Sequence, residues 1–234
     1  MSARLVPKAI KPAELKNVVK FMGDLKARDK LLRLVQYFTK FLVVKLREGD
    51  AKSDLAKRVE LLSKGIGLHR KAFKVGSWLE EYQKFVELVK NGKDDPKRTM
   101  SIILRACMTV FLMLDNAVWL TTLKVADFDK DALKKKAYKF RLTAALLNTA
   151  IGVLDFQKQA LVVEAAKEDA ERVKAEEKQG ANVVGLVKNV FDVVTYANSA
   201  EVFKAVRGSS YGDDVIGLVG AVSSLAALYG IWIK

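Results

Sequence analysis

The chain has 234 residues, and 41 lysines and arginines outnumber 27 aspartates and glutamates, which gives a formal net charge of +14. Half of the residues are hydrophobic, which excludes a disordered basic protein, so the positive charge indicates a polyanionic partner, either nucleic acid or an anionic lipid surface. The single cysteine, Cys107, excludes an intramolecular disulfide and a zinc site built from several cysteines. Residues 1–8 lack the apolar core of a secretory signal, so we expect an intracellular protein.

Apolar residues recur with helical spacing along nearly the whole chain, and none of the three prolines interrupts a long apolar segment. The clearest break lies at residues 91–98, where Gly, Asp and Pro cluster without periodicity. We therefore predict an all-α integral membrane protein with two regions. Residues 1–98 form a cytosolic or interfacial region of basic amphipathic helices, and residues 99–234 form a membrane-embedded helical region.

Residues 24–47 are predicted to form a basic amphipathic helix. Its apolar face is made of Leu31, Leu34, Val35, Phe38, Phe41 and Leu42. The neighbouring basic stripe contains Lys26, Lys30, Arg33 and Lys40. Such a helix can bury its apolar face at the acyl boundary while its cations reach lipid phosphates, so we predict that these ten residues bind an anionic membrane. The alternative is a helix that packs against residues 53–90 with its charges in water, and the pattern leaves both interpretations open.

No stretch carries a recognisable catalytic arrangement. His69 is the only histidine, and its neighbours Arg70 and Lys71 favour a surface or packing role over catalysis. Gly65 and Gly67 lack the Gly-Lys-Ser/Thr ending of a phosphate-binding loop. We therefore expect no enzymatic activity, no cofactor and no metal site.

The second half begins with an apolar segment at 102–123 that contains Arg105 and Asp115. A central aspartate costs about 2.5–3.5 kcal/mol on membrane insertion scales, so this segment should face protein or water on one side, or lie at the interface. Residues 142–156 are marginal as a span, residues 157–182 are charged, and residues 183–206 are apolar but include Lys188 and Asp192, which could pair. Three polar residues in these segments are candidates for lining a pore: Arg105, Asp115 and Asp192. Alternatively, each aspartate lies at a helix end where water reaches it.

Residues 215–233 contain no charged side chain. At 1.5 Å per residue a helix of this length spans about 28 Å, close to the hydrocarbon thickness of a bilayer. We predict a transmembrane helix here, and the alternative is a buried helix in a soluble core. Gly217, Gly220 and Ser224 form a strip of small residues that would allow close helix approach. We predict self-association through this strip, although it could instead pack against another helix of the same chain.

Four stretches in the expected order resemble the peroxin-eleven family of peroxisomal membrane-elongation proteins. The first runs from Gly23 to Phe38 and contains Arg28-Asp29-Lys30, and the second runs from Leu68 to Gly76 and contains Arg70-Lys71-Ala72-Phe73-Lys74. The third runs from Leu114 to Leu120 and contains Asp115-Asn116 and Trp119. The fourth runs from Gly217 to Trp232. Lys74 stands where the family more often has arginine, and the charge is kept.

The resemblance implies a peroxisomal or glycosomal membrane protein whose amphipathic helix inserts into the cytosolic leaflet and bends it. It further implies organelle elongation and proliferation, with recruitment of fission machinery, whereas some family members are proposed to form metabolite channels. We therefore expect a membrane-remodelling protein, with a metabolite pore as the alternative. The expected partners are anionic lipids, further copies of the chain and, by resemblance, fission machinery. A soluble nucleic-acid binder is disfavoured by the charge-free carboxyl-terminal segment.

Overall fold

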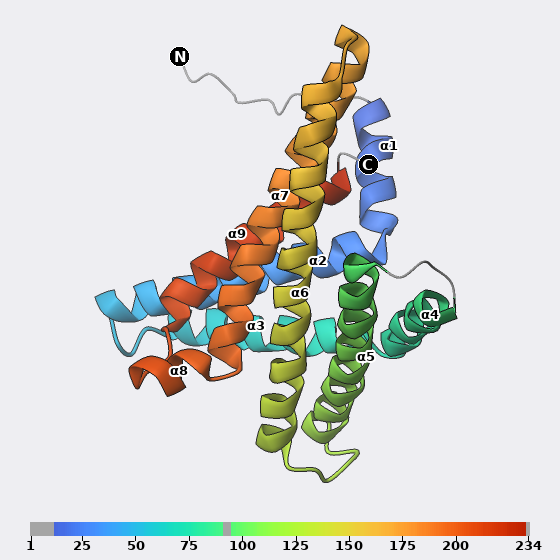
Figure 1. Ribbon diagram of the computed structural model, residues 1–234. Coiled ribbons are helices and arrows are strands. Elements are labelled where there is room, and N and C mark those ends of the chain that lie inside the picture. The colour runs from blue at the N-terminus through green and yellow to red at the C-terminus, as the bar shows by residue number, and fades with distance from the viewer. Residues whose placement is uncertain (1–11, 91–94, 233–234) are drawn as a thin grey trace, which may run out of the picture.

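A computed structural model describes residues 12–90 and 95–232, and these residues form nine α-helices and no strand (Figure 1). The predicted all-α fold is therefore confirmed. The helices are α1 (Pro12–Gly23), α2 (Leu25–Gly49), α3 (Asp54–Ala72), α4 (Ser77–Lys90), α5 (Pro96–Thr122), α6 (Lys130–Ala165), α7 (Asp169–Ser199), α8 (Val202–Arg207) and α9 (Asp213–Trp232).

Aspartate side chains begin several of these helices by accepting hydrogen bonds from the free backbone amides of the first turn. The carboxylate of Asp24 accepts from the amide of Lys26 at 2.6 Å, so the helix predicted at 24–47 begins at Leu25. Asp95 does the same for α5, where Pro96 occupies the first position and has no amide hydrogen to satisfy. The predicted break at 91–98 therefore corresponds to the end of α4 and the start of α5.

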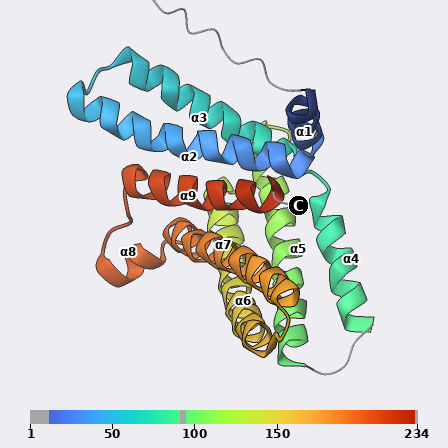
Figure 2. The ribbon, with the colours of Figure 1, turned by 90° about the horizontal axis from the view of Figure 1, so that it is seen from above.

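α2 lies between α3 and α9, and the three helices run side by side (Figure 2). Small residues allow this close packing, because Ala27 of α2 and Ala56 of α3 are almost completely buried. The alternative in which the helix at 24–47 packs against residues 53–90 is thus observed. The structure adds α9 on the other side of α2, so helices from the predicted regions 1–98 and 99–234 pack directly together.

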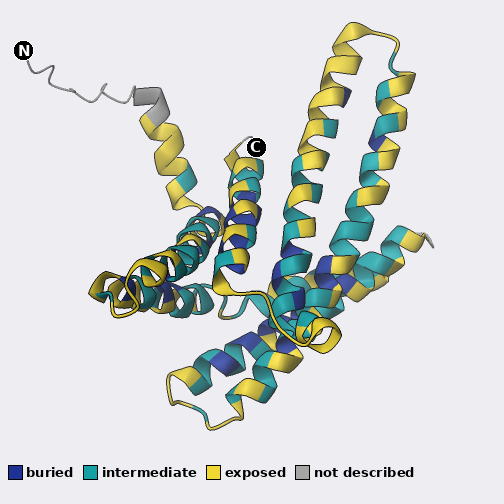
Figure 3. Ribbon diagram, turned by 90° about the vertical axis from the view of Figure 1, so that its left-hand side faces the viewer, coloured by how far each residue is buried: buried dark blue, intermediate teal, exposed yellow. Residues whose placement is uncertain are grey.

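α5, α6 and α7 form a second group, in which α6 packs against both of the others. A small apolar cluster of Phe111, Leu112 and Ala137 joins α5 to α6. The outer part of the α6–α7 hairpin projects beyond the other helices and is largely exposed (Figure 3). The charged segment at 157–182 accounts for this exposure, because it forms the outer ends of these two helices.

Two of the described helices, α5 and α9, are long and apolar enough to cross a bilayer, judged by length and composition alone. Residues 142–156 lie inside α6, which is not one of these two helices, and Ile233 of the predicted span lies outside the described residues. Figures 1 and 2 show that α5 and α9 are not parallel, since α9 follows α2 whereas α5 follows α6.

Candidate functional site: a basic cavity between the two helix groups

A buried ion pair connects the two helix groups. Arg33 of α2 donates from Nη2 to Oδ1 of Asp192 on α7 at 2.6 Å, and the two side chains are only 2% and 3% exposed. The hydroxyl of Ser223 on α9 donates to the same oxygen at 2.6 Å, and Nζ of Lys188 lies 3.0 Å from Oδ2. The predicted pairing of Lys188 with Asp192 is therefore confirmed. Burial alone would raise the pKa of Asp192, but the charges of Arg33 and Lys188 overcome this effect and hold the pKa far below its usual value.

A cavity of 290 Å³ lies beside this ion pair, with walls from α2, α3 and the turn after it, α5, α6, α7 and the start of α9. Its most unusual property is charge, because seven basic side chains line it: Lys30, Arg33, Lys40, Arg70, Lys71, Lys74 and Arg141. Three tyrosines, Tyr37, Tyr138 and Tyr196, also line it, together with one carboxylate among the described residues, that of Asp115.

Carboxylates pair with five of these seven cations. Besides Arg33, Arg70 donates from Nε to Oδ1 of Asp29 at 2.9 Å, and Nζ of Lys30 lies 3.7 Å from Oδ2 of the same aspartate. Lys71 pairs with Asp115. Lys40 pairs with Asp213 at 2.9 Å. Seven cations thus face four carboxylates, and one of these, that of Asp192, is shared with Lys188.

Lys74 and Arg141 have no carboxylate partner within the described part of the chain. Arg141 donates from Nη1 to the thioether sulfur of Met108 at 3.3 Å, which is a weak acceptor. Its guanidinium carbon lies 4.4 Å from the centre of the Tyr196 ring. The cavity therefore contains a guanidinium whose remaining donors are not used by a protein acceptor in the described residues.

The excess of positive charge changes the acid–base behaviour of the site. Burial, together with the neighbouring charge of Arg33, lowers the pKa of Lys30 to about 7, even though part of its side chain remains accessible. Burial and the charge of Arg70 likewise lower the pKa of Lys74. At Asp29 burial acts in the opposite direction, but Lys74, Arg70 and Lys30 bring the net pKa below its ordinary value.

Three of the four stretches that carry the family resemblance meet at this cavity. The stretch from Gly23 contributes Asp29 and Lys30, the stretch from Leu68 contributes Arg70, Lys71 and Lys74, and the stretch from Leu114 contributes Asp115. The fourth begins at Gly217, directly after the lining residue Ile216. The sequence patterns gave no sign of this convergence, because periodicity describes one helix at a time. The four stretches, which we used only for the family resemblance, were the one signal in the sequence that could have found it.

The ten residues predicted to bind lipid occupy different environments. Lys26 and Phe38 are exposed, with Phe38 at 51%. Leu31, Leu34, Val35, Phe41 and Leu42 are half-buried, as are Lys30 and Lys40, whereas Arg33 is buried against Asp192. Most of the predicted apolar face of α2 thus contacts other helices of the chain, and its contact with lipid stays a prediction.

The strip of small residues on α9 faces α2. A Cβ atom added to Gly217 would lie 2.7 Å from the backbone nitrogen of Phe41, and one added to Gly220 would overlap the ring of Tyr37. Ser224 donates its hydroxyl hydrogen to the carbonyl of Gly220 at 2.6 Å. The alternative in which the strip packs within the chain is therefore observed, and self-association through the strip stays a prediction.

The three candidate pore-lining residues do not share one site. Asp115 lines the cavity and Asp192 lies beside it, whereas Arg105 is not among the lining residues and pairs with Glu81 of α4 at 2.7 Å. Each of the three charges is paired with an opposite charge of the same chain.

These features define a class, that of all-α membrane proteins, with two apolar helices of bilayer length and a charged interior. The family described as Peroxisomal biogenesis factor 11 (PEX11) matches residues 15–232, and the chain belongs to this family.

Three plant proteins are similar to part of the chain: the Peroxisomal membrane proteins 11C, 11D and 11E of Arabidopsis thaliana. They are 32%, 32% and 30% identical over 108 residues, which is 46% of this chain and 42%, 42% and 43% of the respective relatives. The matched part thus covers less than half the length of each relative. No solved structure matches the chain.

Proposed function

We propose that this chain remodels the peroxisomal membrane, anchored by α9 and acting through the amphipathic helix α1, which lies in one leaflet. Membership of the PEX11 family and similarity to three plant peroxisomal membrane proteins support the peroxisomal membrane as its location. Recruitment of fission machinery and action on a glycosome rest on the family resemblance alone.

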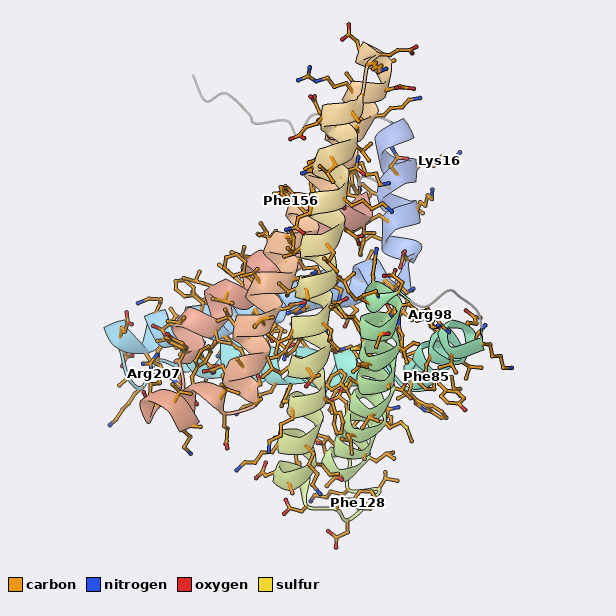
Figure 4. The ribbon with its side chains drawn as sticks, in the orientation of Figure 1. Lys16, Phe85, Arg98, Phe128, Phe156 and Arg207 are labelled. Carbon is orange, nitrogen blue, oxygen red and sulfur yellow. The ribbon has the colours of Figure 1, made fainter. Side chains whose placement is uncertain are left out.

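The observation that carries this proposal is the uncovered apolar face of α1. Leu15, Val18, Val19 and Met22 follow one another at helical spacing, and each side chain is 40–63% exposed. Lys16, labelled in Figure 4, and Lys20 lie on another side of the helix, as the basic residues of an interfacial helix do. An exposed apolar stripe next to cations is costly in water and favourable at the surface of an anionic bilayer.

The position of α1 relative to α9 strengthens this argument. The ring of Phe21 packs edge-on against the indole of Trp232, the last residue of α9, with 5.4 Å between the ring centres. Tryptophan and tyrosine favour the membrane–water interface, and Tyr229 lies one turn before Trp232. If α9 spans the bilayer, α1 lies at the level of the headgroups, where an inserted helix spreads one leaflet.

α3 offers a second apolar surface. Leu55, Leu61 and Leu62 are more than half exposed, and the same helix carries the exposed cations Lys57 and Arg58. Phe38 of the neighbouring α2 is exposed as well. We propose that α1 makes the first lipid contacts at the level of the headgroups. Because α3 runs side by side with α2 and α9, it meets lipid along the length of α9 rather than in the plane of one leaflet, and α2 contributes chiefly Phe38 and Lys26.

Because α5 and α9 are not parallel, at most one of them is perpendicular to a bilayer in this arrangement. α9 is the better span, since α5 contains Arg105 and Asp115 and α9 has no charge after Asp214. We propose that α5 packs within the bundle, where Glu81 and Lys71 neutralise its two charges.

The test uses the full chain reconstituted into liposomes that contain anionic lipid. Replacing Val18 and Val19 by Asn removes about 1.5–3 kcal/mol of transfer free energy per side chain from the apolar face of α1. The variant should stay resistant to alkaline carbonate through α9 but should lose the ability to draw tubules from giant vesicles. The matched control replaces Val125 and Val206, two valines that are also exposed but lie in a loop and in α8. Tubulation by the α1 variant at the level of the control would refute the proposal.

A second candidate function, a metabolite channel, is supported by one observation. Asp115 lines an interior cavity and Asp192 lies beside it, paired with the lining residue Arg33, so neither aspartate lies at a helix end. Conductance across planar bilayers tests this candidate. A channel should lose its ion selectivity when Asp115 is replaced by Asn, whereas a remodelling protein should show no conductance at all.

A further inference from the structure

We propose that the basic cavity between α2, α3, α5, α6 and α7 is a binding site for a phosphate group, carried either by a soluble anion or by a lipid headgroup. This inference goes beyond membrane remodelling and does not depend on it, because the site lies inside the bundle rather than on the apolar faces of α1 and α3.

The first support is the balance of charge. Seven cations line the cavity and only four carboxylates pair with them, one of which also serves Lys188. Gathering like charges in a partly dehydrated space is unfavourable unless anions compensate them. The depressed pKa values of Lys30 and Lys74 express the same imbalance. A bound dianion would reduce this imbalance.

The second support is the set of hydrogen-bond donors that the protein leaves unused. No hydrogen bond joins the hydroxyl of Tyr37, Tyr138 or Tyr196 to another described residue, and all three residues line the cavity. Arg141 donates one hydrogen bond to the thioether of Met108, and Lys74 has no carboxylate partner in the described ranges. A phosphate group accepts several charge-assisted hydrogen bonds at once, and it suits arginine, lysine and hydroxyl donors together.

The third support is size. Pockets for small molecules range from about 300 to 1,000 Å³, so a volume of 290 Å³ admits a small ligand or one headgroup but not a large metabolite. The apolar residues Met108, Phe111 and Leu112 on one wall exclude water and would strengthen the contacts with a bound anion.

The experiment measures binding of pyrophosphate to the full chain in phospholipid-free detergent micelles by isothermal titration calorimetry. Replacing Arg141 by Gln or Lys74 by Gln should weaken binding by roughly 10- to 100-fold, the range expected when one charge-assisted hydrogen bond is lost. The matched controls are Arg207→Gln and Lys139→Gln, which should bind as the wild type does. Arg207, labelled in Figure 4, is also stacked on a tyrosine, with its guanidinium carbon 4.2 Å from the Tyr211 ring centre, but it lies on α8 away from the cavity.

Tyr196→Phe keeps the shape of the site and removes only a hydroxyl, so it tests the proposal even if both charge variants fail to fold. It should weaken binding several-fold while the far-ultraviolet circular dichroism spectrum stays unchanged. The proposal would be overturned if this variant bound with the affinity of the wild type, or if the folded charge variants bound as their controls do. It would also be overturned if the wild type bound neither pyrophosphate nor the lipid probe described below.

The source of the phosphate group is decided by competition. Nanodiscs of phosphatidylcholine with 5% of a phosphorylated inositol lipid are compared with nanodiscs of phosphatidylcholine alone. If the headgroup is the ligand, the protein binds the nanodiscs that contain the inositol lipid, this binding depends on Arg141, and pyrophosphate competes with it. If the ligand is a soluble anion, only pyrophosphate binds. Because detergent micelles cannot be tubulated, failure of this site and failure of membrane remodelling remain distinguishable.

Discussion

The pair of Arg33 and Asp192 joins α2 to α7, and Ser223 ties α9 to the same carboxylate. Each of the two side chains needs the other. A charge that is only 2–3% exposed has lost its hydration, and without its partner no attraction would offset that cost. The stabilising value of a pair of this kind lies less in its attraction than in the cost of breaking it. The pair therefore fixes the position of α2 relative to α7.

Replacing Asp192 by Asn should destabilise the protein by about 3–5 kcal/mol, because Arg33 would stay buried without a counter-charge. Chemical denaturation in detergent, followed by circular dichroism, measures this loss. Asp131→Asn is the control, because Asp131 is 84% exposed and its contact with Lys134 is 3.6 Å long, so its removal should change stability by no more than about 0.5 kcal/mol. Equal effects of the two substitutions would show that the pair is not what joins the helices.

The lowered pKa of Lys30 predicts that the stability of the folded protein depends on pH. Its pKa of about 7 in the folded protein lies below its ordinary value, so the unfolded chain binds more protons between about pH 7 and 10.5. The free energy of unfolding therefore rises with pH across this window. The groups that act on Lys30 are Arg33 and Asp29 from its own helix, Lys74 after α3 and Lys188 of α7.

A bound anion should raise the pKa of Lys30 again, so that binding takes up protons near pH 7.5. Sulfate is the suitable probe because it does not titrate in this range. Calorimetry in buffers of different ionisation enthalpy measures the uptake, which should fall in the variant Lys30→Met. Binding of sulfate by the wild type without proton uptake would contradict the assignment of Lys30 as the titrating group.

At the scale of single helices, α9 has two sides with different roles. Its small residues allow α2 to approach closely, and Gly217, Gly220 and Ser224 are buried there. Its larger residues Leu218, Val222 and Leu225 remain exposed on another side. The helix is therefore apolar nearly all round, as a membrane span requires, and it packs against both α2 and α7 while the side with Leu218, Val222 and Leu225 stays exposed.

Gly220→Ala should destabilise the protein by about 1–3 kcal/mol, because the added methyl group would overlap the ring of Tyr37 on α2. The control is Gly230→Ala in the same helix, where an added Cβ meets nothing within 4 Å and helix propensity should favour alanine. Thermal unfolding in detergent and the abundance of each variant measure the effect. If Gly220→Ala were instead as stable as the wild type and lost only its crosslinked dimers, the strip would serve self-association.

For the whole molecule, the decisive question is which helix anchors it. Replacing Leu218 and Leu225 of α9 by Asn leaves the face toward α2 untouched and places two polar groups on the exposed side. We expect this variant to be released by alkaline carbonate, as measured by its distribution between supernatant and pellet. Leu79→Asn with Leu146→Asn is the control, because these leucines are equally exposed on α4 and α6. Retention of the α9 variant in the pellet would contradict the assignment of α9 as the sole anchor.

The sequence by itself determined the local features of this protein. Periodicity placed the helix that begins at Leu25, the cluster of Gly, Asp and Pro placed the break before Pro96, and the absence of charge placed the apolar helix α9, because each depends on residues close together in the chain. The tertiary structure alone decided what each face touches. Arg33 and Asp192 are 159 residues apart, and no local pattern distinguishes a lysine that faces lipid from one that faces a cavity. Only the packing of the two helix groups against each other brought Lys30, Arg70, Lys74, Asp115 and Arg141 around one cavity, because contacts of this range depend on how helices fit together rather than on helical spacing.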